Sequence, residues 1–298
     1  MEYHVPVLLQ DSISGLNIKP DGTYLDLTFG GGGHSKEILK HLGKGKLIAF
    51  DQDADAEKNI LDDNRFSLID GNFRFFLNYL KFHKINAVDG ILADLGVSSH
   101  HFDQPERGFS FRFDAPLDMR MNQDAEMSAA GILNSYNEDE LRNIFRKYGE
   151  IPNAGKLAAK IAQRRNEKQF NSTFDFVEAI KTCLPPRNDY KYLAKVFQAI
   201  RIEVNNEIDC LSEMLLQTLL VLKPGGRLVI ITYHSLEDRL VKNFMKYGML
   251  DGQPEKDIYG RMEIPFKLIT RKAIEPNENE LIINSRARSA RLRIAEKI

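Results

Sequence analysis

The chain has 298 residues, of which 43% are hydrophobic and 28% charged, and its formal net charge is −1. Such a composition is typical of a soluble globular protein with enough length for one large domain or two ordinary ones. The near-neutral total excludes a uniformly basic surface, so any contact with nucleic acid must come from local basic patches. The N-terminus has neither the basic nor the apolar region of a secretion signal, and no apolar run reaches the ~18 residues of a membrane helix. We therefore expect a cytoplasmic protein that does not contact a membrane.

The two cysteines, Cys183 and Cys210, have apolar neighbours and no CxxC or histidine-rich context. We interpret them as buried small side chains in a reducing cytosol. Histidine, cysteine and aspartate do not cluster with the spacing of metal ligands, so the sequence does not imply metal catalysis.

The glycine run Gly30–Gly33 is the feature around which the rest of the chain is organised. A buried strand, Thr23–Leu27, precedes it, and a helix over Ser35–Leu42 follows it. A second strand, Lys46–Phe50, ends in Asp51, about 20 residues after the glycines, where nucleotide-binding βαβ units place an acid against ribose hydroxyls. This order of elements predicts a nucleotide site, whereas a glycine cluster alone indicates only a loop.

Strands and helices continue to alternate after Asp51. Helices around 54–61 and 73–81 separate strands at 66–70 and 88–95, which predicts an α/β fold with a doubly wound parallel sheet. The alternation returns near the C-terminus. A helical region over about 192–222 leads to a strand at 227–232, and further strand candidates at 266–270 and 290–295 could form an antiparallel edge.

Between residues 104 and 190 no strand pattern recurs, and we predict an inserted helical domain there. One helix is capped by Asn137, a second covers 154–167, and a third starts at Ser172 or Thr173 with Phe174, Val177 and Ile180 as its buried face. Residues 1–103 and 191–298 then form the other, discontinuous domain.

Basic residues gather in two places. Lys156, Lys160 and Arg164 share one face of the second inserted helix, and Arg286, Arg288, Arg291 and Arg293 lie near the C-terminus. Either cluster could contact RNA backbone. The first could equally be an ordinary solvated helix face, and Arg291 and Arg293 could flank a strand.

Three functions remain open at this point. A dinucleotide-dependent oxidoreductase would use the glycines for a pyrophosphate, but the usual GxGxxG spacing is missing. An S-adenosylmethionine-dependent methyltransferase needs no phosphate contact there, and Leu222–Gly226 before a late strand resembles a sequence recurrent in that superfamily. A non-catalytic RNA-binding protein on an α/β scaffold is the third.

Longer motifs resemble those of one family, the ribosomal RNA small subunit methyltransferase H family, over essentially the whole chain. The motifs are Thr28–Ser35, Asp94–Ser99, Glu106–Phe111, Pro116–Met121, Phe197–Ile202, His234–Arg239 and Arg286–Arg293. The departures from the family pattern, at Ala115, Asn122, Lys195-Val196 and Ser285, lie outside the cofactor loop.

The resemblance implies a Rossmann-like class I methyltransferase sheet with the helical insertion recognising substrate. It implies N4-methylation of a cytidine in the decoding region of 16S ribosomal RNA, with S-adenosylmethionine as cofactor and the small ribosomal subunit as partner. The cofactor-binding residues that it implies are Gly32, Gly33, His34, Asp51, Phe73, Asp94 and His101. The sequence does not indicate an oligomeric state.

The catalytic residues are less constrained. Many enzymes that methylate amino groups carry an Asp/Asn-Pro-Pro-aromatic loop after the fourth strand, and this chain has Asp94–Ser99 there instead. Ser98 and His234 are our candidates for positioning the target base, with Tyr233 as a stacking partner. The alternative is that Ser98 stabilises a turn and His234 caps the following helix.

Overall fold

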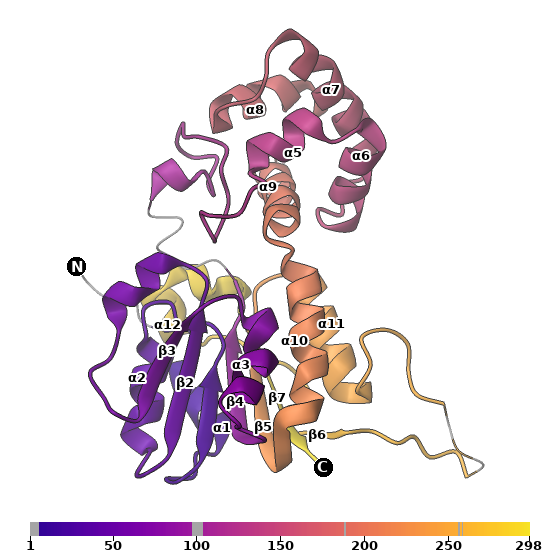
Figure 1. Ribbon diagram of the computed structural model, residues 1–298. Coiled ribbons are helices and arrows are strands. Elements are labelled where there is room, and N and C mark those ends of the chain that lie inside the picture. Colours follow the sequence, from indigo (N-terminus) through magenta and orange to yellow (C-terminus); the bar gives the residue numbers. More distant parts are fainter. Residues whose placement is uncertain (1–5, 97–103, 188, 256, 258) are drawn as a thin grey trace. The chain divides into compact units, whose positions relative to one another are not determined.

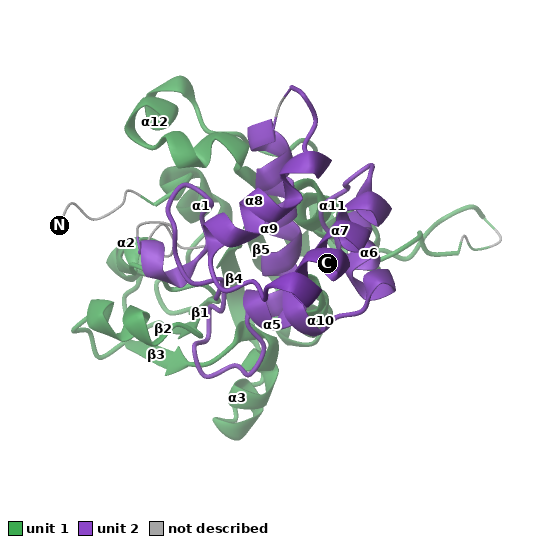
Figure 2. Cartoon of the chain, turned by 90° about the horizontal axis from the view of Figure 1, so that it is seen from above, with its two compact units in different colours: residues 1–96, 208–298 green, residues 97–207 purple. Residues whose placement is uncertain are grey.

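The computed structural model describes residues 6–96, 104–187, 189–255, 257 and 259–298 (Figure 1). The chain divides into two compact units, which Figure 2 colours separately: unit 1 comprises residues 1–96 and 208–298, and unit 2 comprises residues 97–207. The sequence placed the second boundary at 190, and the structure places it at 207. Helix α9 (Asp189–Asn205) accounts for the difference, because it packs against α5 (Ala129–Ser135) and α6 (Glu138–Lys147) of unit 2.

Unit 1 contains a seven-stranded sheet in the order β3-β2-β1-β4-β5-β7-β6. Strands β1 to β5 pair in parallel, while β7 pairs antiparallel with both β5 and β6. The predicted doubly wound sheet and its antiparallel edge are therefore confirmed. The strands are β1 (Thr23–Asp26), β2 (Lys46–Asp51), β3 (Phe66–Asp70), β4 (Val88–Asp94), β5 (Leu222–Thr232), β6 (Phe266–Leu268) and β7 (Arg291–Lys297).

Apolar side chains leave both faces of this sheet, which is why its strands read as continuous hydrophobic runs. Along β1, Leu25 belongs to the core on one face and Tyr24 to the core on the other. Helices α3 (Phe76–Phe82), α10 (Glu207–Val221) and α11 (Ser235–Tyr247) contribute to the first core, and α1 (Leu9–Leu16) and α2 (Gly33–His41) to the second. The remaining helical elements of unit 1 are η1 (Ala54–Asn59), η2 (Phe73–Phe75), α12 (Glu278–Ile283) and η5 (Ser285–Ser289).

Unit 2 is helical in its described part. Besides α5, α6 and α9 it contains η3 (Pro105–Arg107), α7 (Ala154–Glu167), α8 (Thr173–Ile180) and η4 (Lys181–Cys183). The Asn137 cap is confirmed as a full capping box with Glu140, and α7 has the predicted bounds. Helix α5 was not predicted. Within the described residues, no helix is long and apolar enough to cross a membrane.

The buried face of α8 differs from the prediction. Ile180 is buried as predicted, but Phe174 is 48% exposed and Val177 is only half-buried, and the helix buries Thr173 and Phe176 instead. Thr173 explains the rotation, because its hydroxyl donates to the carbonyl of Phe113 and accepts from the amide of Ala115, so a polar residue at the helix start is fully buried. A hydrophobic pattern alone cannot reveal such a polar anchor.

Long loops precede α5, and a residue of α9 forms hydrogen bonds with their backbone. Arg107 is buried and donates to the carbonyl oxygens of Arg120 and Met121. Asn205 accepts from the amide of Met121 at 2.7 Å and donates to the carbonyl of Met119 at 2.8 Å. These contacts fix the 107–121 segment although it contains little regular structure.

Candidate cofactor site at the carboxyl ends of the parallel strands

The glycine loop connects β1 to α2 and adopts a conformation that requires glycine. Gly30 and Gly32 have φ values of 53° and 73°, in the left-handed region that other residues rarely adopt. At Gly33 a Cβ atom would lie 2.1 Å from the Cγ of Pro6, so only glycine allows this close approach. Gly32 is the N-cap of α2, and no side chain caps that end. The loop therefore presents backbone to its surroundings where a cofactor would approach.

Asp51 ends β2 and connects this strand to the loop. Its Oδ2 accepts the amide of Gly30 at 2.7 Å, and its Oδ1 accepts the amide of Asp53 at 2.9 Å. Asn59 supports the same loop by donating to the carbonyl of Gly30 at 3.1 Å. The structure thus brings together the acid and the glycines predicted from the sequence. Asn59 carried no signal in the sequence because it lies in a short helical turn without a motif.

Asp26 is a buried acid that the sequence analysis missed. It ends β1, and its carboxylate accepts the hydroxyl of Ser35 at 2.6 Å and the amide of Thr28 at 3.2 Å. Burial raises its pKa, and both hydrogen bonds oppose that effect. Asp26 therefore joins the first turn of α2 to the start of the loop. Its position at the end of a buried strand is the sequence feature that could have identified it.

Asp94 ends β4, and three elements surround it. Its amide donates to Thr28 Oγ1 at 2.7 Å, and its Oδ1 accepts the hydroxyl of Tyr233 at 2.7 Å. Burial raises the pKa of Asp94 to about 6, while the Tyr233 hydroxyl opposes the rise. The group is therefore mainly a carboxylate at pH 7, with a hydroxyl holding one of its oxygens in place.

His34, in the first turn of α2, lies beside Asp94. Its Nδ1 is 4.0 Å from Asp94 Oδ2, and its Nε2 is 3.1 Å from the carbonyl oxygen of Val7. Burial lowers the pKa of His34, so the imidazole is neutral at pH 7. A carbonyl can only accept, which assigns the imidazole proton to Nε2 and leaves the Nδ1 lone pair on the side of the carboxylate.

Phe73 follows β3 and begins η2, at the same end of the sheet as the other residues. It is half-buried and packs against the core that contains α3 and α10. Gly32, Gly33, His34, Asp51, Phe73 and Asp94 thus all lie at or after the carboxyl ends of parallel strands, the usual position of ligands in such sheets. Ser98 and His101, also predicted for the site, lie outside the described residues.

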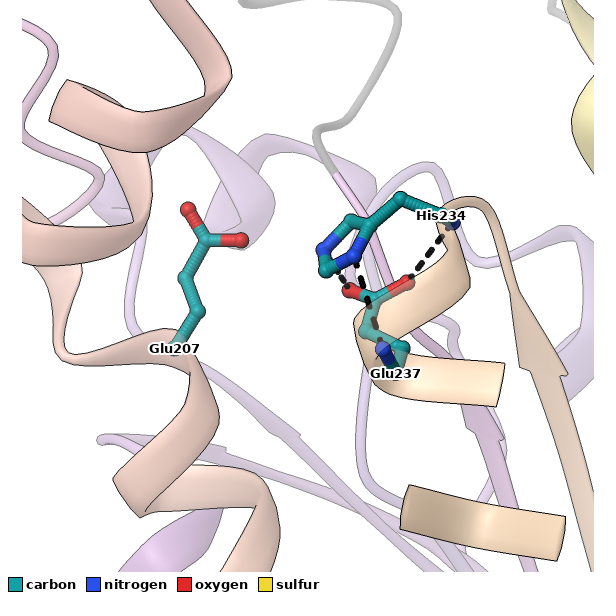
Figure 3. A group of neighbouring side chains, drawn as sticks. All are labelled: Glu207, His234 and Glu237. Carbon is teal, nitrogen blue, oxygen red and sulfur yellow. Dashed lines mark hydrogen bonds and ion pairs between the residues drawn. The ribbon is translucent and has the colours of Figure 1, made fainter. Parts of the chain in front are cut away.

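His234 follows β5 and caps α11, as the structural alternative predicted. Its Nδ1 accepts the amide of Glu237 at 3.4 Å, and the Glu237 carboxylate accepts the amide of His234 (Figure 3). The same carboxylate also accepts the amide of Tyr233. His234 Nε2 also lies 3.1 Å from Glu237 Oε1. Figure 3 also draws Glu207, whose carboxylate receives two hydrogen bonds from Arg201.

Two arginines of the C-terminal basic cluster form hydrogen bonds within unit 1. Arg293 on β7 donates two hydrogen bonds to Asp238 of α11, at 2.7 and 3.0 Å, and Arg291 donates a third at 3.4 Å. Both arginines therefore belong to a strand, and the charge of Arg293 is compensated by Asp238, whereas the side chain of Arg291 is 48% exposed.

The parallel sheet, the glycine loop and the strand-end acids define an α/β protein with a nucleotide-type site at the carboxyl ends of its strands. The model of the MraW methylase family matches residues 1–298. Ribosomal RNA small subunit methyltransferase H of Flavobacterium johnsoniae is 58% identical over 299 residues, which cover 100% of this chain and 99% of that protein. The proteins of the same name from Bacteroides thetaiotaomicron and Parabacteroides distasonis are 56% and 54% identical over 298 residues, with at least 99% of this chain and 98% of each relative covered.

The chain belongs to the MraW methylase family. It is an S-adenosylmethionine-dependent methyltransferase, and the oxidoreductase left open by the glycine spacing is excluded. The residues present fit this cofactor, because the loop glycines allow close approach and Asp51 supplies carboxylate oxygens next to them.

We expect Asp51→Ala to weaken S-adenosylmethionine binding by about 1–3 kcal/mol, or roughly 5- to 150-fold, since ribose hydroxyls would lose a charged acceptor. Calorimetric titration of the folded variant measures this. Asp70→Ala is the matched control, because Asp70 pairs with Asp51 in the sheet register but is exposed at the end of β3. Equal affinities of Asp51→Ala and the parent would remove Asp51 from the cofactor site.

Proposed function

We propose that this enzyme transfers the methyl group of S-adenosylmethionine to N4 of a cytidine in the decoding region of 16S ribosomal RNA, in the cytoplasm, on the small subunit or its RNA. The observation that carries the proposal is the full-length identity of more than half of all residues to methyltransferases named for small-subunit ribosomal RNA. The acids and glycines at the carboxyl ends of β1, β2 and β4 support it, because they supply a site for the cofactor.

Bound S-adenosylmethionine supplies a methyl group on a sulfonium, which an in-line nucleophile can displace. The glycine loop and Asp51 would hold this cofactor, and methylation of N4 would release S-adenosylhomocysteine and one N4 proton, which passes to water or to a protein acceptor. Most of the acceleration can come from orientation of the two reactants. Because N4 shares its lone pair with the cytosine ring, an acceptor for the N4 proton would increase its nucleophilicity.

The residues that we propose for positioning the base and accepting the N4 proton are Ser98 and His234. His234 lies at the end of β5, one residue after Tyr233, which holds Asp94. Both ring nitrogens face Glu237, because Nδ1 accepts its amide and Nε2 lies 3.1 Å from its carboxylate. A hydrogen bond from the imidazole to the base therefore requires His234 to give up one of these contacts. The same contacts also serve the capping box, so the two roles need separate tests.

The proposed reaction is tested by incubating the enzyme with methyl-labelled S-adenosylmethionine and either small subunits or protein-free 16S RNA. Digestion to nucleosides should place the label in N4-methylcytidine. Label in another nucleoside, or in none with either substrate, would contradict the proposal.

Two substitutions separate capping from chemistry at His234. Asparagine is a strong N-cap residue and alanine is a weak one, so His234→Asn should retain the stability of α11 and His234→Ala should lose about 1 kcal/mol. If the imidazole positions the base, both variants should lose turnover under single-turnover conditions while cofactor affinity stays near the parent value. Full turnover by His234→Asn would restrict His234 to capping.

We further propose that unit 2 is the substrate-recognition domain and that α7 contacts RNA phosphates. Lys156 and Lys160 project from this helix, with Lys156 donating to the carbonyl of Thr182 and Lys160 lying 3.5 Å from Gln163 Oε1. Arg164 pairs with Glu167 on the same exposed face. Exposed pairs of this kind contribute little and exchange readily for a phosphate.

Reversing Lys160 and Arg164 to Glu should weaken RNA binding and reduce its salt dependence by roughly one unit of slope for each phosphate that the helix no longer binds. Cofactor affinity should stay unchanged. Lys242→Glu with Lys246→Glu is the control, since these exposed lysines have the same spacing on α11 of unit 1. Parent-like RNA affinity and salt slope in the Lys160 and Arg164 double variant would show that α7 does not contact the RNA.

A further inference from the structure

Among the described residues of unit 2, three aromatic side chains are about half exposed and lie outside its core. The side chains of Phe113, Phe174 and Tyr190 are 50%, 48% and 50% exposed. Single exposed apolar residues are ordinary, but these three come from separate segments that the structure joins. Their grouping therefore needs an explanation.

Hydrogen bonds and ring contacts hold the three segments together. Thr173 donates its hydroxyl to the carbonyl of Phe113 at 2.6 Å, and the amide of Phe174 donates to Asp114 Oδ1 at 3.2 Å. On the other side of the same loop, the ring of Tyr190 meets Phe111 edge-on with centroids 4.8 Å apart. Residues 111–114 thus connect all three exposed rings.

Buried aromatic rings of the unit 2 core pack against this loop. Phe111 contacts Phe197 at 5.2 Å between centroids, Phe197 contacts Phe176 at 6.0 Å, and Phe176 contacts Phe170 at 5.7 Å. Phe170, Phe176 and Phe197 are each at most 4% exposed. The loop that carries Phe113 is therefore anchored to the core of unit 2 by packed rings, and little ordering is needed when a ligand binds.

Charged groups border the rings. Arg112 donates its Nε to the Tyr190 hydroxyl at 2.6 Å, and its guanidinium lies 5.7 Å from the Tyr190 ring centroid. A cavity of about 330 Å³ beside Phe174 is lined by two cations, Arg164 and Lys168, and by three carboxylates, Asp114, Asp175 and Glu178. Lys168 donates to Asp175 at 2.9 Å, and Arg164 pairs with Glu167. Cations suit phosphates, carboxylates accept from the amino groups of bases, and exposed rings stack on base faces.

We propose that Phe113, Phe174 and Tyr190 form a shelf on which unpaired bases of the RNA substrate stack. This inference rests on the proposed function and specifies how unit 2 would recognise single-stranded RNA. An enzyme that methylates an exocyclic amine needs its target base outside a paired stack. The neighbouring nucleotides then also lose stacking partners, and the three rings would supply replacements.

The shelf is tested with the full-length enzyme and short single-stranded RNA of mixed sequence that carries 2-aminopurine. We expect the parent enzyme to change the probe's fluorescence as the base stacks. Tyr190→Ala and Phe174→Ala should each weaken binding about 5- to 100-fold, the range for loss of one stacked base. Tyr190→Phe keeps the ring and should bind within about twofold of the parent if stacking rather than the hydroxyl holds the base.

Salt dependence and matched controls distinguish stacking from charge. Removing a ring leaves every phosphate contact in place, so the salt slope of the alanine variants should equal that of the parent, unlike the slope of the Lys160 and Arg164 double variant. Phe82→Ala and Tyr259→Ala remove rings that are 81% and 79% exposed in unit 1, and neither should change RNA affinity.

Three results would overturn the shelf: no fluorescence change with the parent enzyme, parent-like affinity of both alanine variants, or weaker binding seen with assembled subunits but not with the oligonucleotide. The last would indicate that the rings contact a ribosomal protein. Failure of the proposed function is separate, because it would appear as absence of N4-methylcytidine with the parent enzyme, whatever the oligonucleotide does.

Discussion

The hydrogen bond from the Gly30 amide to the Asp51 carboxylate is the contact on which the cofactor site depends, because it joins the loop after β1 to the end of β2. Parallel pairing of β1 with β2 and β4 places three strand ends at one edge, so Asp26, Asp51 and Asp94 meet there although they are far apart in sequence. An antiparallel arrangement would separate these ends. The direction of the strands therefore brings these residues together, and the individual side chains then determine what the site can bind.

The buried acids at this edge have different partners and therefore different tasks. Asp26 binds Ser35 and the loop amide of Thr28, which makes it part of the scaffold. Asp94 has a pKa raised by burial to about 6, and the hydroxyl of Tyr233 binds one of its oxygens. The other oxygen is 4.0 Å from a neutral imidazole, too far for a hydrogen bond. Among the described residues, the Asp94 carboxylate accepts a hydrogen bond from Tyr233, and an acid that is costly to bury is suited to bind a ligand group.

Most strands of unit 1 could be predicted because both faces of the sheet are buried, which produces unbroken apolar runs such as Leu47–Phe50. The acid after β2 and the glycines could be predicted from their spacing. Buried polar contacts could not be predicted from the sequence. The buried hydroxyl of Thr173 orients α8 so that Phe174 is exposed. Asn205 binds a loop that is more than 80 residues away in the sequence. His234 shows a further limit, since the same side chain satisfies the pattern of a capping residue and of a catalytic one.

A net charge of −1 constrains how such an enzyme can hold RNA. Long-range attraction between a near-neutral protein and a polyanion is weak, so affinity must come from short-range contacts at a few places. Arg293 is paired with Asp238, so the C-terminal cluster offers less positive charge than the sequence suggests. Stacking on rings depends little on salt or total charge, and it is specific for bases that have left a duplex. Aromatic rings fixed to the core of unit 2 would therefore favour single-stranded substrate where charge alone would favour any RNA.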